Sequence, residues 1–153
     1  MNLYEAQEMA KTLMRSILDP TWKFEWNNRK GAFGVCNFSK KTIFLSRHFT
    51  QIENADHVRD TILHEIAHAI AGCAAGHGRE WREAARRIGL ADPTRCSKSS
   101  NPEAMAASYR YAIMYEDKII KGYHRRPTID LTGRYLNGRP ETKGKLRIVQ
   151  LSA

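Results

Sequence analysis

The spacing of apolar residues predicts a helix over residues 3–18. Apolar side chains recur there every three or four positions, which is the spacing of one helix face. The pattern stops at Asp19-Pro20, because proline cannot continue a helix. We expect the apolar face of this amphipathic helix to pack against the rest of the fold. That face is formed by Leu3, Ala6, Ala10, Leu13 and Ile17.

Three strands are predicted after this helix. Trp22, Phe24 and Trp26 alternate with polar residues, which is the period of a half-buried strand. Residues 32–38 and 42–46 are also rich in apolar residues and are bounded by turn residues. Because short turns join these segments, we expect a three-stranded antiparallel meander.

Two more helices are predicted in the middle of the chain. Asn54 and Asp56 are both good N-caps, and apolar residues follow at i, i+4 spacing as far as Gly72. These residues are Val58, Ile62, Ile66 and Ile70. Residues 79–89 form the second candidate, which ends at a glycine. Its inner face would carry Trp81, Ala85 and Ile88.

The last third of the chain carries weaker signals. Residues 94–101 are polar and typical of a loop. A short helix is compatible with the segment that starts at Asn101-Pro102, and tyrosines alternate over residues 109–115 as in a strand. Residues 146–149 form the clearest late strand.

These elements predict an α+β fold with a core over residues 1–100 and a small, basic, β-rich segment over residues 101–153. At 153 residues the chain is long enough to bury one sizeable core. No apolar run approaches the roughly 18 residues of a membrane helix, and we expect no secretory signal and no membrane partner. Three cysteines do not form a disulfide framework, which favours a reducing environment. We therefore expect a cytoplasmic protein, either associated with the nucleoid or in the cytoplasm of a host cell.

Basic residues are concentrated in the last quarter of the chain. Residues 1–117 hold 16 basic and 14 acidic side chains, whereas residues 118–153 hold nine basic and two acidic ones, a balance of +7. Such a block favours a polyanionic partner, of which nucleic acid is the commonest, although it also suits a solvated surface. The nine cations are Lys118, Lys121, Arg125, Arg126, Arg134, Arg139, Lys143, Lys145 and Arg147.

His64-Glu65-Ile66-Ala67-His68 is the most informative motif. Two histidines at i and i+4 lie on one helix face about 6 Å apart at Cβ, so their imidazoles can converge on one metal ion. Glu65 lies about 100° round the helix from His64, so it borders the ion without being a ligand. From there it can take a proton from a water bound to the ion.

A catalytic zinc requires a third protein ligand and one open position. His77 is the favoured third ligand, because it follows His68 by nine residues and lies between two glycines. Glu80 or Glu83 would instead complete a set of two histidines and a glutamate. Cys73 is a further alternative, although the nearby helix end restricts its reach.

Residues 64–68 (HEIAH) and 77–81 (HGREW) together resemble the SprT-like, Spartan-related family of zinc metallopeptidases. The resemblance covers roughly residues 3–90 and includes the N-terminal helix and the Trp-rich first strand. It implies a zincin-like core in which His64, His68 and His77 bind zinc and Glu65 is the catalytic base. We expect Trp81 to be a core anchor under the zinc-binding helix.

The C-terminal segment departs from the family pattern. Many bacterial members carry a zinc ribbon there, with two pairs of cysteines, whereas no cysteine follows Cys96 in this chain. We therefore expect one zinc ion per chain and a degenerate ribbon without metal, or a segment that becomes ordered on meeting a partner. A ribbon without metal would be held by aromatic side chains such as Tyr111, Tyr115, Tyr123 and Tyr135.

The resemblance implies a zinc-dependent endopeptidase that acts on DNA-associated or DNA-cross-linked proteins, with the basic segment as a DNA tether. It also implies that an extended substrate pairs with the edge of the meander. One alternative is a nucleic-acid-binding protein with a structural zinc, closed by a fourth ligand such as Cys73, and no protease activity. Another is a peptidase that acts on free proteins. Tyr109, Tyr111 and Arg79 are open candidates for the oxyanion-stabilising group.

Overall fold

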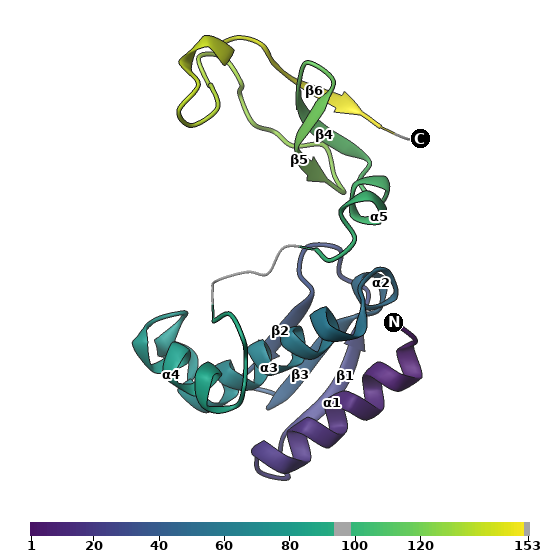
Figure 1. The fold of residues 1–153 in the computed structure, drawn as a ribbon, viewed down its shortest axis with the longest axis vertical. Coiled ribbons are helices and arrows are strands. Elements are labelled where there is room, and N and C mark those ends of the chain that lie inside the picture. The colour runs from purple at the N-terminus through teal and green to yellow at the C-terminus, as the bar shows by residue number, and fades with distance from the viewer. Residues whose placement is uncertain (94–98, 152–153) are drawn as a thin grey trace. The chain divides into compact units, whose positions relative to one another are not determined.

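The computed structural model describes residues 1–93 and 99–151 and divides into two units, Met1–Asn101 and Pro102–Ala153 (Figure 1). The division lies one residue beyond the boundary predicted at residue 100. Part of the loop predicted over residues 94–101 lies outside the described residues, and so does Cys96. Within the described ranges, no helix is long and apolar enough to cross a membrane.

The first unit contains all the helices and strands predicted for it and one additional short helix. In chain order its elements are α1 (Leu3–Ile17), β1 (Lys23–Asn27), β2 (Gly34–Asn37), β3 (Thr42–Ser46), α2 (Arg47–Ile52), α3 (Ala55–Ala71), the 3-10 turn η1 (Cys73–Ala75) and α4 (Arg79–Arg87). The additional helix, α2, begins directly where β3 ends. Ser46 caps it by accepting a hydrogen bond from the backbone N–H of Phe49. A helix of six residues is too short for apolar periodicity to reveal it.

The predicted antiparallel meander is wrong. The strand order is β1-β3-β2, and β1 is parallel to β3 while β2 is antiparallel to it. The chain therefore crosses from one edge of the sheet to the other before it enters β3. Ser46 holds this crossing, because its hydroxyl donates to the carbonyl of Arg29 at 2.6 Å and its N–H to that of Phe33 at 2.9 Å. β3, in the central position, is the most deeply buried of the three strands.

Helices α1 and α3 lie on the same face of this sheet (Figure 1). Side chains from these two helices and from β3 form one core, namely Ala6, Ala10, Met14, Ile43, Leu45, Val58, Ile62 and Ile66. On its other side, α3 packs against α4 through a second cluster that includes Leu63, Ala67, Trp81 and Ala85. Because α3 is covered on both sides, even polar residues such as His57, Thr61 and Glu65 are buried along it.

The second unit is built on an antiparallel sheet of order β5-β4-β6. Its elements are α5 (Pro102–Ala107), β4 (Tyr111–Tyr115), β5 (Lys118–Tyr123), the 3-10 turn η2 (Pro140–Thr142) and β6 (Leu146–Gln150). The short helix and two of the strands were expected, but β5 was not. Two adjacent isoleucines, Ile119 and Ile120, interrupt the alternation expected of a strand. The register of β5 shifts at this point, opposite Ile113 and Met114.

Aromatic side chains hold this unit only in part. Tyr115 is buried, but Tyr135 is 53 % exposed, so the expectation for Tyr135 is wrong. A threonine stabilises the turn before β6 instead. Thr142 is fully buried, and its hydroxyl donates to the carbonyl of Arg139 at 2.7 Å and accepts from the N–H of Leu136 at 2.9 Å.

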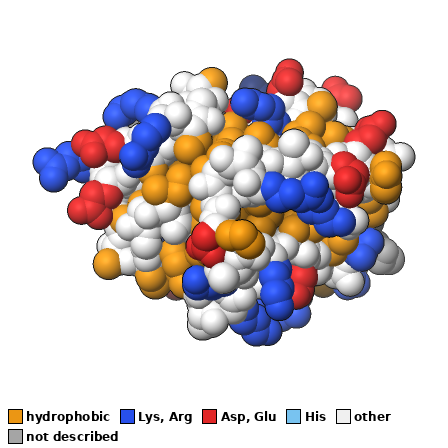
Figure 2. Space-filling model, turned by 90° about the horizontal axis from the view of Figure 1, so that it is seen from below, with side chains coloured by type: hydrophobic (Ala, Val, Ile, Leu, Met, Phe, Trp, Pro, Cys, Tyr) orange, Lys and Arg blue, Asp and Glu red, His pale blue; other side chains and the backbone are white. Residues whose placement is uncertain are grey.

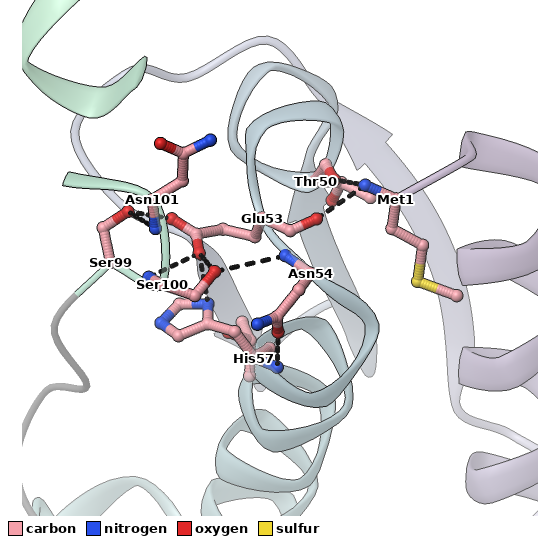
Figure 3. A network of polar contacts seen from close by, with 9 residues as sticks. Met1, Thr50, Glu53, Asn54, His57, Ser99, Ser100 and Asn101 are labelled. Atoms are coloured by element: carbon pink, nitrogen blue, oxygen red, sulfur yellow. Dashed lines mark hydrogen bonds and ion pairs between the residues drawn. The ribbon is translucent and has the colours of Figure 1, made fainter. Parts of the chain in front are cut away.

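A buried carboxylate ties the end of the first unit to the junction between α2 and α3 (Figure 3). Glu53 is 2 % exposed. Its carboxylate accepts hydrogen bonds from the hydroxyls of Ser99 and Ser100 and from the N–H of Ser100. Nδ1 of His57 lies 3.5 Å from the same group. Residues 99 and 100 are therefore anchored to a site 46 or 47 positions earlier in the chain.

We expect Glu53→Gln to lower the free energy of unfolding by about 1–3 kcal/mol at pH 7, because it removes a charged acceptor of buried hydrogen bonds. Burial alone would raise the pKa of Glu53, but the hydrogen bonds from Ser100 and Ser99 outweigh it and lower the pKa below 4.5. This stabilisation is present above the pKa of Glu53 in the unfolded chain, and it is lost as the pH falls through the pKa of Glu53 in the folded state. Urea unfolding at pH 7 and pH 3.5 measures the loss of stability and its dependence on pH. Glu25→Gln, at an exposed position, is the control. A pH-independent difference between wild type and Glu53→Gln would contradict the assignment.

Candidate metal centre

Helix α3 places two histidines of the site one turn apart. Asn54 caps the helix, accepting from the N–H of His57 at 2.9 Å, so the helix begins at a fixed residue. His64 and His68 follow on the same face, and both are half-buried. Their ring centroids lie 5.0 Å apart.

A tight turn after α3 brings the third histidine back to the first two. Gly72 ends the helix with φ +85°, η1 follows, and Gly76 has φ +50° and ψ −128°. Both glycines have positive φ, which favours a residue without a side chain. The N–H of Gly78 then donates to the carbonyl of Ala75 at 2.9 Å, which closes the turn around His77.

The ring nitrogens of the three histidines converge. Nε2 of His77 lies 3.0 Å from Nε2 of His64 and 3.1 Å from Nε2 of His68. Among the residues that the structure describes, these three form the group of ligating side chains that could hold a metal ion. Cys73, Glu80 and Glu83 do not belong to it. The geometry therefore selects His77 from the alternatives that the sequence leaves open.

The donor set fits a zinc ion. Zinc bound to imidazole nitrogens at about 2.0–2.1 Å with tetrahedral angles would separate those nitrogens by about 3.3 Å, close to the observed spacing. Burial, and then the neighbouring His68 and His77, lower the pKa of His64 from 6.5 to about 4. Burial and His77 lower the pKa of His68 to about 4. The lowered pKa values favour the neutral form of His64 and His68, which is the form that binds a metal ion.

Trp81 forms a common support for the three rings. It is fully buried on α4, and its ring centroid lies 4.7 Å from that of His64, 5.5 Å from that of His68 and 4.7 Å from that of His77. Its indole N–H donates to the carbonyl of His64 at 3.4 Å. This position agrees with the core role expected from the sequence, and it also restricts the orientation of the imidazoles.

Glu65 lies on another side of α3, against β2, and is 7 % exposed. Burial raises the pKa of Glu65 from 4.5 to about 7, opposed by a backbone hydrogen bond from Cys36. A carboxyl group with a pKa near neutrality can both accept and release a proton at physiological pH. Burial, and then Glu65 and Cys73, raise the pKa of the Cys36 thiol to about 12, which disfavours the nucleophilic thiolate form.

Two contacts at the site were not foreseen from the sequence. The guanidinium Nε of Arg82 donates to the carbonyl of His77 at 3.2 Å, so α4 also fixes the backbone of the third histidine. Gly34 of β2 lies directly against the side chain of Glu65. A single glycine inside a strand pattern can indicate such a close approach, although it does not say which residue approaches.

Comparison with known proteins gives a match to a family. The model of the SprT-like family matches residues 4–103, which include α3, η1 and α4. No curated protein matches the chain. The three histidines, Glu65 and Trp81 all lie inside the matched range.

Proposed function

Because the chain belongs to the SprT-like family, which is associated with metallopeptidase function, we propose that it is a zinc-dependent endopeptidase with a zincin-like active site. The observation that carries this proposal is the convergence of three histidine ring nitrogens, two of them from a helix that also bears a buried glutamate. Three protein ligands leave one position of a tetrahedral zinc site for water or substrate, as in catalytic rather than structural sites.

His64, His68 and His77 would hold the ion, which supplies a Lewis acid that polarises the scissile carbonyl and activates a water molecule. Glu65 accepts a proton from that attacking water and passes it to the leaving amine. The support of Trp81 under all three imidazoles keeps the ligands in place during this transfer. The burial of Glu65 keeps its proton affinity suited to a general base near pH 7.

The substrate of this reaction would be an extended polypeptide. β2 is an edge strand of the sheet, so among the described residues one side of it has no strand partner. The same strand lies against Glu65. A substrate chain that adds to the free edge of β2 by backbone hydrogen bonds would thus lie close to the general base.

We further propose that the second unit directs the enzyme to proteins bound or cross-linked to DNA. Residues 118–153 carry a balance of +7, and Lys118 and Lys121 are exposed on the edge strand β5. On the face drawn in Figure 2, in contrast, basic and acidic side chains are interspersed and form no single positive patch. Because residues 1–117 carry a balance of only +2, attraction to phosphate would come chiefly from the C-terminal cations.

We expect the double substitution of Lys118 and Lys121 by glutamine to weaken DNA binding and to reduce its salt dependence. Each cation that contacts a phosphate contributes about 0.9 to the slope of log K against log salt, so the slope should fall by up to about 2. Fluorescence anisotropy with labelled DNA at several salt concentrations measures this. Lys30→Gln with Lys40→Gln, two exposed lysines of the first unit, is the matched control. An unchanged slope in the β5 variant would remove these lysines from the interface.

The proposed activity is tested by removing and restoring zinc. The protein is stripped with a chelator, reloaded with zinc at known stoichiometry, and incubated with a DNA-bound protein and with the same protein without DNA. We expect cleavage only after reloading, with one zinc ion per chain, and preferentially of the DNA-bound protein. Stoichiometric zinc and DNA binding without any cleavage would instead identify a nucleic-acid-binding protein with a structural zinc. Equal cleavage of both substrates would identify a peptidase that acts on free proteins.

A further inference from the structure

The side chain of Glu65 lies in a narrow space between α3 and the edge strand β2. Gly34 pairs with Leu45 across the sheet, and Leu45 belongs to the core on the face that α1 and α3 cover. Paired residues on neighbouring strands point to the same face. Any side chain at position 34 would therefore point towards α3, at the level of Glu65.

A side chain at that position would have to displace Glu65. A Cβ atom at Gly34 would lie 2.8 Å from Cγ and 2.9 Å from Oε1 of Glu65, and 3.1 Å from Cγ2 of Thr61. Separations below 3.0 Å are essentially never found for a real Cβ atom. The backbone of β2 and the carboxyl group of Glu65 can thus be this close only because residue 34 is glycine.

Thr61 and Cys36 complete the enclosure. Thr61 precedes Glu65 by one helical turn, and its hydroxyl donates to the carbonyl of His57 at 2.9 Å, which fixes its methyl group towards Gly34. The backbone of Cys36, two residues along β2, acts on the Glu65 carboxyl from the strand side and lowers its pKa. Long side chains on a helix lean towards the preceding turn, so Glu65 extends between the Thr61 methyl and the strand.

We propose that Gly34 is a positioning residue for Glu65, an inference that rests on the proposed role of Glu65 as the general base. Because residue 34 has no side chain, β2 forms a wall that holds the carboxyl in one place. A side chain at residue 34 would displace the carboxyl from this wall without touching the three histidines. Displacing a catalytic group by about 1 Å can cost on the order of 100-fold in rate.

Gly34→Ala tests this role in the zinc-loaded protein. We expect kcat for peptide hydrolysis to fall about 100-fold, with KM nearly unchanged and with zinc affinity equal to that of the wild type. Gly31→Ala is the matched control, because nothing lies within 4 Å of a Cβ at that position and its φ is not in the left-handed region. It should leave all three quantities unchanged.

A double-mutant cycle on stability provides a measurement that needs no cleavage. In the metal-free protein we expect Gly34→Ala to lower Tm by about 5 °C, although alanine is normally favoured over glycine in a strand. In the Glu65→Ala background, which removes Cγ and Oε1, the same substitution should lower Tm much less or raise it. Such non-additivity is the signature of direct contact between the two residues.

The possible results separate the role of Gly34 from the proposed function. Full cleavage by Gly34→Ala would overturn the positioning role and leave the peptidase proposal intact. Loss of zinc from Gly34→Ala would also overturn it, because the damage would then lie in the metal site. An additive stability cycle would also overturn the proposal. If the zinc-loaded wild type cleaves no substrate, the peptidase proposal fails, and the cycle alone decides whether Gly34 determines the position of Glu65.

Discussion

Replacing Glu65 with glutamine should reduce peptide hydrolysis by about 10²- to 10⁴-fold while zinc remains bound at one ion per chain. Glutamine has nearly the same shape as glutamate and fits the same buried space, but it cannot accept the proton of the attacking water. The three histidines are untouched, so the metal affinity should be that of the wild type. Single-turnover cleavage combined with zinc analysis on the same preparation measures both quantities.

The same substitution should stabilise the metal-free protein at high pH. Burial raises the pKa of Glu65 from 4.5 to about 7. A carboxyl group whose pKa is raised on folding favours its protonated form, so the folded state loses stability as the pH rises from the unfolded to the folded pKa. The free energy of unfolding of Glu65→Gln should therefore exceed that of the wild type by almost nothing at pH 4 and by at most about 3 kcal/mol at pH 8.

Urea unfolding of the metal-free wild type and of Glu65→Gln at these two pH values measures this difference in stability and its sign. The lowered pKa values of the histidines act in both proteins and cancel in the difference. Glu80→Gln, an exposed carboxylate on α4, is the control for both activity and stability. Wild-type cleavage by Glu65→Gln would remove Glu65 from the mechanism, even if zinc were bound as expected.

Replacing His77 with alanine should weaken zinc binding by more than the ~10- to 100-fold that the loss of an outer-shell partner costs. The two remaining histidines would offer only half of a tetrahedral set, and cleavage should be lost together with the metal. Competition with a chromogenic chelator gives the affinity. His77→Cys, which restores a ligand that zinc accepts, should recover part of the affinity.

Glu83→Ala is the critical control for this experiment. Glutamate at position 83 was a possible third ligand on spacing alone, whereas in the structure its carboxylate is exposed and lies 3.9 Å from Nε of Arg79. We expect its removal to leave zinc affinity unchanged. If Glu83→Ala weakened zinc binding as strongly as His77→Ala, the three histidine ring nitrogens would not be the complete set of metal ligands.

The parts of the molecule that depend on local sequence could be predicted. The two histidines and the glutamate on α3 follow from helical periodicity, and Asn54 was recognisable as a cap. The third ligand was predictable only as one of several candidates. The choice of His77 depends on the backbone conformation of Gly72 and Gly76, which brings the chain back over α3.

The parts that depend on distant contacts could not be predicted. The parallel pairing of β1 with β3 follows from the loop that Ser46 holds through Arg29 and Phe33, and strand spacing contains no information about it. Gly34 was visible as a glycine within a strand, but the approach of Glu65 to it arises from the packing of α3 on the sheet. In each case the determining contact joins residues well separated in the chain.

The anchoring of Ser99 and Ser100 on Glu53 has a consequence for how the protein can be divided. A fragment that ends at Asn101 keeps the hydrogen bonds from Ser99 and Ser100 to the buried carboxylate, whereas one that ends at residue 93 loses them. The structural boundary of the first unit therefore includes two serines beyond its last long helix. A truncation that removes the second unit should therefore be placed after these serines, so that the start of α3, the helix that carries His64 and His68, keeps this anchor.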